Sequence, residues 1–118
     1  MTDRGPVLAD LDRPRLDAPV TLALIADPHL AVEGDGTWKL RHRSEPRLRT
    51  AIETANEADA VAFVGDLTND GRPAEFDRVD DLFADLSVPW TAVPGNHDVA
   101  KSFDSHETPP IADFARRY

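Results

Sequence analysis

The sequence contains no cysteine, and Lys39 and Lys101 are its only lysines. Without cysteine the chain forms no disulfide, no thiolate zinc site and no cysteine nucleophile. No apolar stretch approaches the roughly 20 residues that a membrane-spanning helix needs. The first residues also lead into no apolar core of a secretory signal peptide. These absences favour a cytoplasmic protein that has no membrane segment.

Positive charge is also scarce, and the 22 acidic residues against 13 lysines and arginines leave a formal net charge of -9. An acidic, lysine-poor surface resembles those of proteins from salt-loving microbes, in which high salt screens self-repulsion. An ordinary acidic, soluble protein is the alternative, and composition leaves both open. The acidity argues against a nucleic-acid partner and a nuclease. It does not argue against a small phosphate ester, because bound metal ions would invert the local field.

At 118 residues the chain has room for one domain. Residues 1–19 combine three prolines with charged residues, and we expect an amino-terminal arm there, in which Val7–Ala9 is a candidate edge strand. Residues 20–118 are predicted to form the folded domain.

Three short apolar runs alternate with stretches of helical periodicity. The first run, residues 20–26, is apolar enough to predict a strand covered on both faces. Ser44 is a candidate cap of the first helix, and Pro73 is placed where the second helix begins. Strands joined by helical crossovers pair in parallel, so the pattern predicts an α/β fold with a βαβαβ unit. The predicted strands are 20–26, 60–64 and 88–93, and the predicted helices are 46–55, 73–86 and 109–118.

Polar residues appear at the point where each predicted strand ends. Asp27-Pro28-His29 follows the first, Gly65-Asp66 the second, and Asn96-His97-Asp98 comes shortly after the third. Parallel strands place their carboxyl ends on one edge of the sheet, where open α/β sheets bind ligands. We therefore expect these side chains to meet in one crevice.

Carboxylate, imidazole and amide groups are ligands for Mn²⁺, Fe or Zn²⁺, with Ni²⁺ or Co²⁺ as alternatives. Asp27 and His29 are spaced to reach one ion, and Asp66 has two oxygens with which to bridge two ions. Two such ions clamp the attacking and leaving oxygens of a phosphoryl displacement. His97 would then act as general acid or stabilise the transition state, with Asp98 holding its imidazole in one tautomer.

These segments resemble the first three motifs of the calcineurin-like metallophosphoesterases over residues 20 to about 100. They are Asp27-Pro28-His29, Gly65-Asp66-Leu67-Thr68-Asn69 and Gly95-Asn96-His97-Asp98. Residues 65–71 are similar to the cyclic-nucleotide phosphodiesterase-like branch.

The resemblance implies the first half of a four-layer β-sandwich with a dinuclear metal centre. It implies that Asp27, His29 and Asp66 bind one ion, that Asp66 bridges to a second ion also bound by Asn96, and that His97 is the catalytic histidine. The expected reaction is hydrolysis of a phosphomonoester or phosphodiester by a hydroxide that bridges the two ions.

The sequence departs from the family in its later motifs. Members supply a further histidine and a Gly-His-x-His motif, whereas the four histidines here are His29, His42, His97 and His106. We do not expect His106 to substitute, because it follows the third motif too soon. Three explanations stay open: an amino-terminal portion of a longer enzyme, a partner chain or oligomer that completes the site, or a non-catalytic interaction subunit of the same ancestry.

Several other features have an ordinary structural interpretation beside a functional one. Each motif alone is typical of a turn, and only their joint occurrence at successive strand ends favours a metal site. Arg41, His42 and Arg43 are candidates for contact with a substrate phosphate or for a solvated loop surface. Trp38 suits either a loop anchor or a pocket wall. Asn69 is a candidate for orienting a ligand, or an ordinary turn former.

Overall fold

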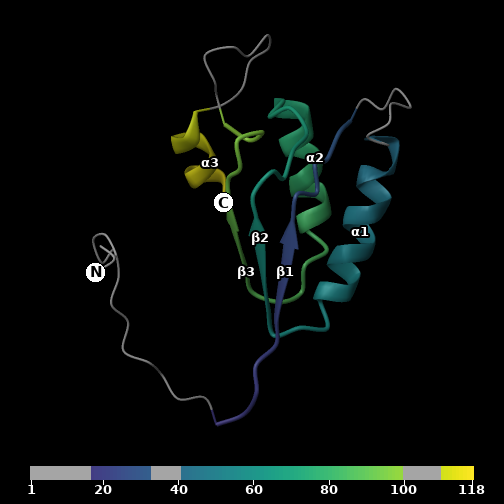
Figure 1. Ribbon diagram of the computed structural model, residues 1–118, viewed down its shortest axis with the longest axis vertical. Coiled ribbons are helices and arrows are strands. Elements are labelled where there is room, and N and C mark those ends of the chain that lie inside the picture. Colours follow the sequence, from purple (N-terminus) through teal and green to yellow (C-terminus); the bar gives the residue numbers. More distant parts are fainter. Residues whose placement is uncertain (1–16, 33–40, 100–109) are drawn as a thin grey trace, which may run out of the picture.

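The structure is a computed structural model that describes residues 17–32, 41–99 and 110–118. Three parallel strands form one sheet, and helices pack beside it (Figure 1). Within the described residues, no helix has the length and apolar character needed to cross a bilayer. In chain order the elements are β1 (Leu22–Ala26), η1 (Arg41–Arg43), α1 (Ser44–Ala55), β2 (Ala60–Val64), α2 (Pro73–Phe83), β3 (Trp90–Val93) and α3 (Ile111–Arg117).

The strands lie in the order β1-β2-β3, and both neighbouring pairs are parallel. Leu22 pairs with Ala60 and Val61 pairs with Trp90, which fixes the register of the whole sheet. The predicted α/β fold with a parallel βαβαβ unit is therefore confirmed. It is consistent with the first half of the metallophosphoesterase fold. Because all strands run the same way, their carboxyl ends share one edge.

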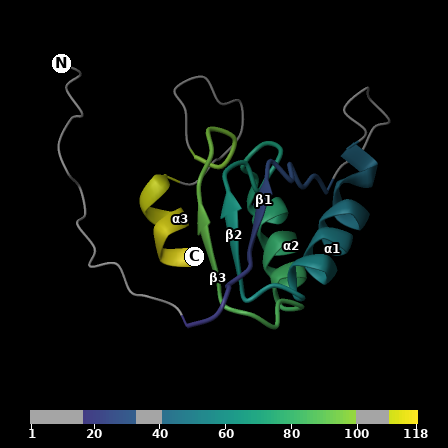
Figure 2. The same cartoon turned by 60° about the horizontal axis from the view of Figure 1, so that its bottom comes forward.

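The hydrophobic core lies between the sheet and helices α1 and α2. Val61 and Phe63 point from β2 into this core, and Ala23 and Ile25 pack against it from β1. Each large apolar side chain buried here contributes about 1.5–3 kcal/mol. Figure 2 shows α1 and α2 together on one side of the sheet. The helical core residues are Leu48, Ile52, Ala55, Phe76, Val79, Leu82, Phe83 and Phe114.

Helix α3 follows residues outside the described ranges and packs against α2. The ring of Phe114 contacts that of Phe76 edge to face, with the ring centroids 6.2 Å apart. Tyr118 meets Phe83 and Trp90 in the same way. Arg117 pairs with Asp77 and Asp80 of α2 at the surface. Aromatic packing therefore joins α3 to α2 and to the edge strand β3.

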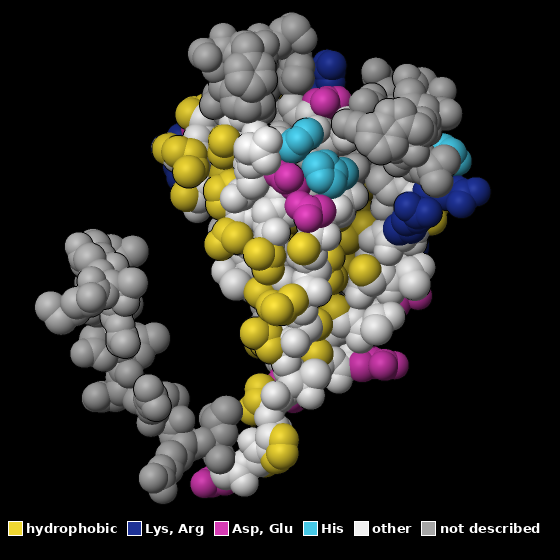
Figure 3. All heavy atoms as spheres, viewed as in Figure 1, with side chains coloured by type: hydrophobic (Ala, Val, Ile, Leu, Met, Phe, Trp, Pro, Cys, Tyr) yellow, Lys and Arg dark blue, Asp and Glu magenta, His cyan; other side chains and the backbone are white. Residues whose placement is uncertain are grey.

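The opposite face of the sheet is not covered by the described residues. Leu22 and Leu24 are 56% and 66% exposed, and Val64 and Val93 are 46% and 50% exposed. A yellow band of hydrophobic side chains marks this face in Figure 3. The expectation that the first strand would be covered on both faces is not met within the described chain. A near-continuous apolar strand is typical of a sheet buried on both sides. This exposed face is therefore suited to packing against a further layer of structure.

The element boundaries differ from the predicted ones at several ends. Ser44 is the first residue of α1 and not its cap, because its hydroxyl is engaged with Ala31 of the segment after β1. Strands β1 and β3 are shorter than predicted, and α2 ends at Phe83. The candidate edge strand Val7–Ala9, Trp38 and His106 lie outside the described residues.

Candidate metal centre

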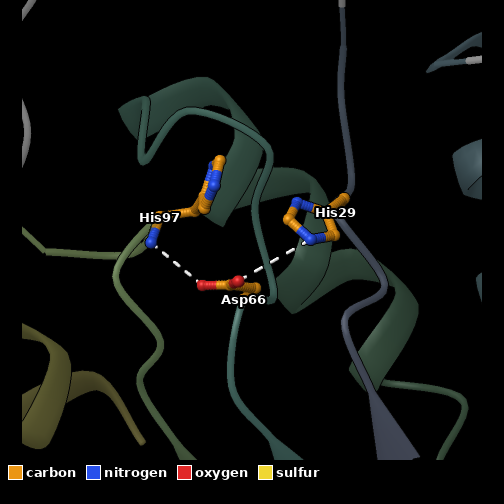
Figure 4. A group of neighbouring side chains, drawn as sticks. All are labelled: His29, Asp66 and His97. Carbon is orange, nitrogen blue, oxygen red and sulfur yellow. Dashed lines mark hydrogen bonds and ion pairs between the residues drawn. The ribbon is translucent and has the colours of Figure 1, made fainter. Parts of the chain in front are cut away.

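The ends of the three strands bring three side chains into one group. His29 follows β1, Asp66 follows β2 and His97 follows β3, and ligand atoms of the three lie within 4.8 Å of one another. Figure 4 shows the Asp66 carboxylate between the two imidazoles. In Figure 3, histidine and acidic side chains gather at the upper end of the hydrophobic band. Three of the side chains expected to meet at this edge of the sheet therefore lie together, and Asp27 is not part of this group.

Three residues after the strands have backbone conformations that non-glycine residues seldom adopt. Asp27, His29 and Asp66 have φ angles of 51°, 46° and 50°. Aspartate and histidine are among the residue types enriched in this left-handed region. Each such residue costs on the order of 1–3 kcal/mol, and such strain concentrates at functional sites. All three are residues that we predicted as metal ligands.

Backbone hydrogen bonds join the segment after β1 to the segment after β2. The amide of His29 donates to the carbonyl of Asp66 over 2.9 Å, and that of Leu30 donates to Leu67 over 2.9 Å. Asn69 donates back to the carbonyl of Leu30 over 3.0 Å. Parallel pairing thus continues past the strands, and it fixes His29 relative to Asp66.

The segment after β3 approaches Asp66 closely because residue 95 is glycine. A Cβ atom at Gly95 would lie 2.0 Å from Oδ1 of Asp66 and 2.4 Å from its backbone nitrogen. Gly65 also has a positive φ of 82°, and it lies against the backbone of Gly95. Only a residue without a side chain permits this approach, which places the loop of Asn96 and His97 beside the carboxylate.

The two oxygens of the Asp66 carboxylate have different neighbours. Oδ1 accepts a hydrogen bond from the backbone N–H of His97 over 2.9 Å, and Oδ2 lies 3.6 Å from Nε2 of His29. Asp66 is buried, whereas His29 is partly exposed. Asp27 is more exposed, and its Oδ1 lies 4.0 Å from Nε2 of His29. An incoming cation would therefore meet Oδ2 of Asp66 and His29 from the solvent side.

The imidazole of His97 is held by a backbone carbonyl. Its Nδ1 lies 2.5 Å from the oxygen of Asn69, and its ring meets that of His29 edge to face at 4.8 Å. A carbonyl oxygen only accepts hydrogen bonds, so this contact places the proton of neutral His97 on Nδ1. Nε2 is then the nitrogen left for a ligand or for proton transfer.

Asp98 does not contact the imidazole of His97 in this arrangement. Its carboxylate is fully buried and accepts hydrogen bonds from the backbone amides of Leu67, Thr68 and Gly95 and from the hydroxyl of Thr68. Thr68 is also fully buried. It lies within the second motif of the sequence, but no role was predicted for it, because a threonine among turn formers does not reveal its partner.

The remaining predicted site residues lie near this group or outside the described ranges. Asn96 is exposed on the loop after β3, where it interacts with another group of the protein. Arg43 and His42 are exposed at the start of α1, next to Ser44, whose hydroxyl accepts a hydrogen bond from the amide of Ala31 over 3.1 Å. The roles predicted for Asp27, His29, Asp66, Asn96, His97 and Asp98 stay predictions.

The donor set fits a divalent transition-metal ion. It consists of imidazole nitrogens and carboxylate oxygens, which suit Mn²⁺, Fe and Zn²⁺. Nε2 of His29 lies 3.6 Å from Oδ2 of Asp66, and no salt bridge to lysine or arginine neutralises Asp66 among the described residues. The group formed by His29, Asp66 and His97 is therefore a candidate site for at least one ion.

Several curated proteins match part of this chain. A protein of Synechococcus named "Probable cyclic nucleotide phosphodiesterase" is 33% identical over 79 residues, which are 65% of this chain and 28% of that protein. A protein of the same name from Psychrobacter arcticus is 28% identical, with 70% of this chain and 33% of that protein covered. A 3',5'-cyclic-nucleotide phosphodiesterase of Nostoc is 29% identical, with 73% and 34% covered.

The chain thus spans about a third of the length of these curated relatives. The sequence model of the calcineurin-like phosphoesterases matches residues 20–118, which include all three strands and every residue of the candidate site. The chain belongs to the calcineurin-like phosphoesterase family.

Proposed function

We propose that this chain carries the first part of the metal site of a phosphoesterase that hydrolyses a phosphodiester, with a 3',5'-cyclic nucleotide as the first substrate to test. The observation that carries the proposal is the convergence of His29, Asp66 and His97 at one edge of the sheet. The names of the relatives supply the substrate class. A phosphomonoester remains the alternative substrate.

The proposed roles follow the positions of the side chains. Asp27, His29 and Asp66 would hold one divalent ion, and Asn96 would contribute to a second ion that shares Asp66. Bound metal would polarise the phosphoryl oxygens and lower the pKa of a water molecule. The buried carboxylate of Asp66 is held at Oδ1 by the amide of His97, so Oδ2 is oriented before an ion arrives. Preorganisation of this kind lowers the cost of binding.

His97 would act on the substrate through Nε2. Because Nδ1 is engaged by the carbonyl of Asn69, the ring cannot rotate freely, and Nε2 is the nitrogen left to act. In the imidazolium form, which carries a proton on Nε2 as well as on Nδ1, it would donate the Nε2 proton to a leaving alkoxide or stabilise the charge that develops on the phosphoryl group. We expect loss of this imidazole to reduce the rate more than metal affinity.

A calorimetric titration of the full-length protein with Mn²⁺ tests the metal site, and hydrolysis of bis(p-nitrophenyl) phosphate and 3',5'-cyclic AMP tests the activity. Asp66→Ala should abolish both. Asp81→Ala is the matched control, because Asp81 is exposed on α2 and has only a surface ion pair with Arg78, which is worth about 0–1 kcal/mol. Activity that survives in Asp66→Ala would refute the assignment.

The exposed apolar face of the sheet supports a second candidate function. Leu22, Leu24 and Val64 are exposed on that face, and large exposed apolar patches mark interaction surfaces. The chain would then act as a non-catalytic interaction subunit of metallophosphoesterase ancestry. Metal stoichiometry separates the two: tight Mn²⁺ binding that is lost in Asp66→Ala supports the enzyme, and absence of binding supports the interaction subunit.

A further inference from the structure

Thr68 and Asp98 form a fully buried pair of polar side chains on the two loops that carry Asp66 and His97. Oγ1 of Thr68 lies 2.8 Å from Oδ1 of Asp98 and 3.3 Å from the carbonyl oxygen of His97. A hydroxyl has one hydrogen, and the shorter contact assigns it to the Asp98 carboxylate. The same hydroxyl oxygen accepts the amide hydrogen of Gly71 over 2.9 Å.

The carboxylate of Asp98 is satisfied by groups from two different loops. Leu67 and Thr68, which follow β2, donate their backbone amides over 3.0 and 2.9 Å. Gly95, which follows β3, donates its amide over 3.0 Å. A buried carboxylate tolerates its desolvation only when several donors compensate it, and charged acceptors make hydrogen bonds about twice as strong as neutral ones. Asp98 therefore joins the two loops strongly.

Those two loops carry the reactive side chains. Asp66 is next to Leu67 and His97 is next to Asp98, so the bonds of the Asp98 carboxylate act within two residues of the candidate centre. A shift between the loops would break the bond from the His97 amide to Oδ1 of Asp66. It would also move the carbonyl of Asn69, which is next to Thr68 and holds Nδ1 of His97.

We propose that Thr68 is a positioning residue, which acts through Asp98 to fix the Asp66 carboxylate and the His97 imidazole relative to each other. This inference rests on the proposed function, because the side chains that it positions are those of the proposed metal site. It assigns Asp98 to holding the loops together, in place of holding the tautomer of His97.

The test compares variants of the full-length protein by their Mn²⁺ dissociation constant and by kcat and KM for bis(p-nitrophenyl) phosphate. Thr68→Val removes the hydroxyl at nearly constant volume, and we expect metal affinity and kcat to fall about tenfold or more, as for other residues that orient ligands. Thr68→Ser keeps the hydroxyl and should rescue both.

Two controls separate positioning from a general loss of stability. Thr54→Val makes the same change where the hydroxyl donates to a backbone carbonyl on the exposed side of α1. Val79→Ala destabilises the core from α2, away from both loops. Both should bind Mn²⁺ within about twofold of the unmodified protein. If Thr68→Val does not fold, Thr68→Ala against Thr68→Ser gives the same comparison, since these two differ only in the hydroxyl.

Hydrogen exchange gives a readout that needs no activity. The amides of Leu67 and Thr68 should exchange faster in Thr68→Val than in Val79→Ala, because both donate to Asp98. An active enzyme in which Thr68→Val matches the unmodified protein in Mn²⁺ affinity, kcat and exchange would overturn the inference and leave the proposed function intact. A protein that binds no Mn²⁺ and hydrolyses neither ester would overturn both.

Discussion

The backbone N–H of His97 donates a hydrogen bond to Oδ1 of Asp66 over 2.9 Å, although 31 residues separate them in the chain. The bond joins the residue that we propose as a bridging metal ligand to the residue that we propose as the catalytic histidine. It is one of several hydrogen bonds that join the loops after β2 and β3. The close approach depends on Gly95.

A side chain at position 95 should therefore damage the site directly. In Gly95→Ala the new Cβ would lie 2.0 Å from Oδ1 of Asp66, so the carboxylate or the loop must move. We expect Mn²⁺ affinity to fall at least about tenfold in a calorimetric titration. Gly65→Ala is the comparison, because its Cβ would meet Gly95 at an ordinary 3.5 Å and only its φ of 82° is unfavourable. It should cost about 1–2 kcal/mol of stability with a smaller loss of affinity. Equal affinities in the two variants would contradict the steric argument.

A second prediction concerns which ring nitrogen of neutral His97 carries the proton. The carbonyl of Asn69 faces Nδ1, so neutral His97 should carry its proton on Nδ1 and leave Nε2 free. Two-dimensional ¹⁵N–¹H spectra of the full-length protein with labelled histidine distinguish the two tautomers. Because the acceptor is a backbone atom, Asn69→Ala should leave the assignment unchanged. A proton found on Nε2 would show that another group orients the ring.

Glu75 makes the stability of the fold depend on pH. Its side chain is buried in the first turn of α2, where it accepts hydrogen bonds from the amides of Asp70 and Arg72. Burial raises the pKa of Glu75 above its ordinary value of 4.5. The protonated acid is thus favoured in the folded state, and its contribution to stability is full below about pH 4.5 and is lost as pH rises through the raised pKa.

Glu75→Gln should remove this dependence while keeping an acceptor for both amides. The free energy of unfolding of the variant, relative to the unmodified protein, should increase between pH 4 and pH 7, as measured by urea denaturation. Glu53→Gln, at an exposed position of α1, controls for the substitution itself. A relative stability that decreases over this range would mean that the hydrogen bonds to the ionised carboxylate outweigh its desolvation.

We expect the 118-residue chain to self-associate when it is produced alone, because the open face of its sheet is apolar. Leu22, Leu24 and Val64 expose apolar surface there, so we expect binding of a hydrophobic dye and a mass by light scattering above the 13.0 kDa of one chain. Leu24→Asp should reduce both. Ile111→Asp is the control, because Ile111 is equally exposed on α3. A chain that stays monomeric and binds no dye would show that this face needs no covering layer.

Much of the fold follows from local sequence patterns. The alternation of apolar runs with helical periodicity predicted the three strands and three α-helices that the structure describes, but not the short 3-10 helix η1, since periodicity reports which side of an element is buried. The boundaries were less well predicted. Ser44 was expected to cap α1, but its hydroxyl contacts Ala31, 13 residues earlier, and no local pattern reveals a partner at that distance. The predicted covering of both faces of β1 is not met within the described residues, because apolarity shows that a face needs burial and not what buries it.

The candidate site was predicted in its membership but not in its connections. Motifs at three strand ends identified His29, Asp66 and His97, and parallel topology is sufficient to bring them together. The partner of the His97 ring is a backbone carbonyl, which every residue has, so side-chain patterns could not distinguish it. Asp98 was matched with the nearest imidazole in sequence, whereas its carboxylate reaches across to Thr68.

By itself, the sequence determined the α/β architecture and the chemical class of the site. Both follow from local patterns, which are the order of strands and helices along the chain and the residue types at the strand ends. Only the tertiary structure decided which oxygen of Asp66 is engaged, which nitrogen of His97 is free, and that Thr68 and Asp98 lie beneath them. Those features depend on how loops about 30 residues apart approach one another. That approach is set by the sheet register, by backbone conformations at Asp27 and Asp66, and by the absence of a side chain at Gly95.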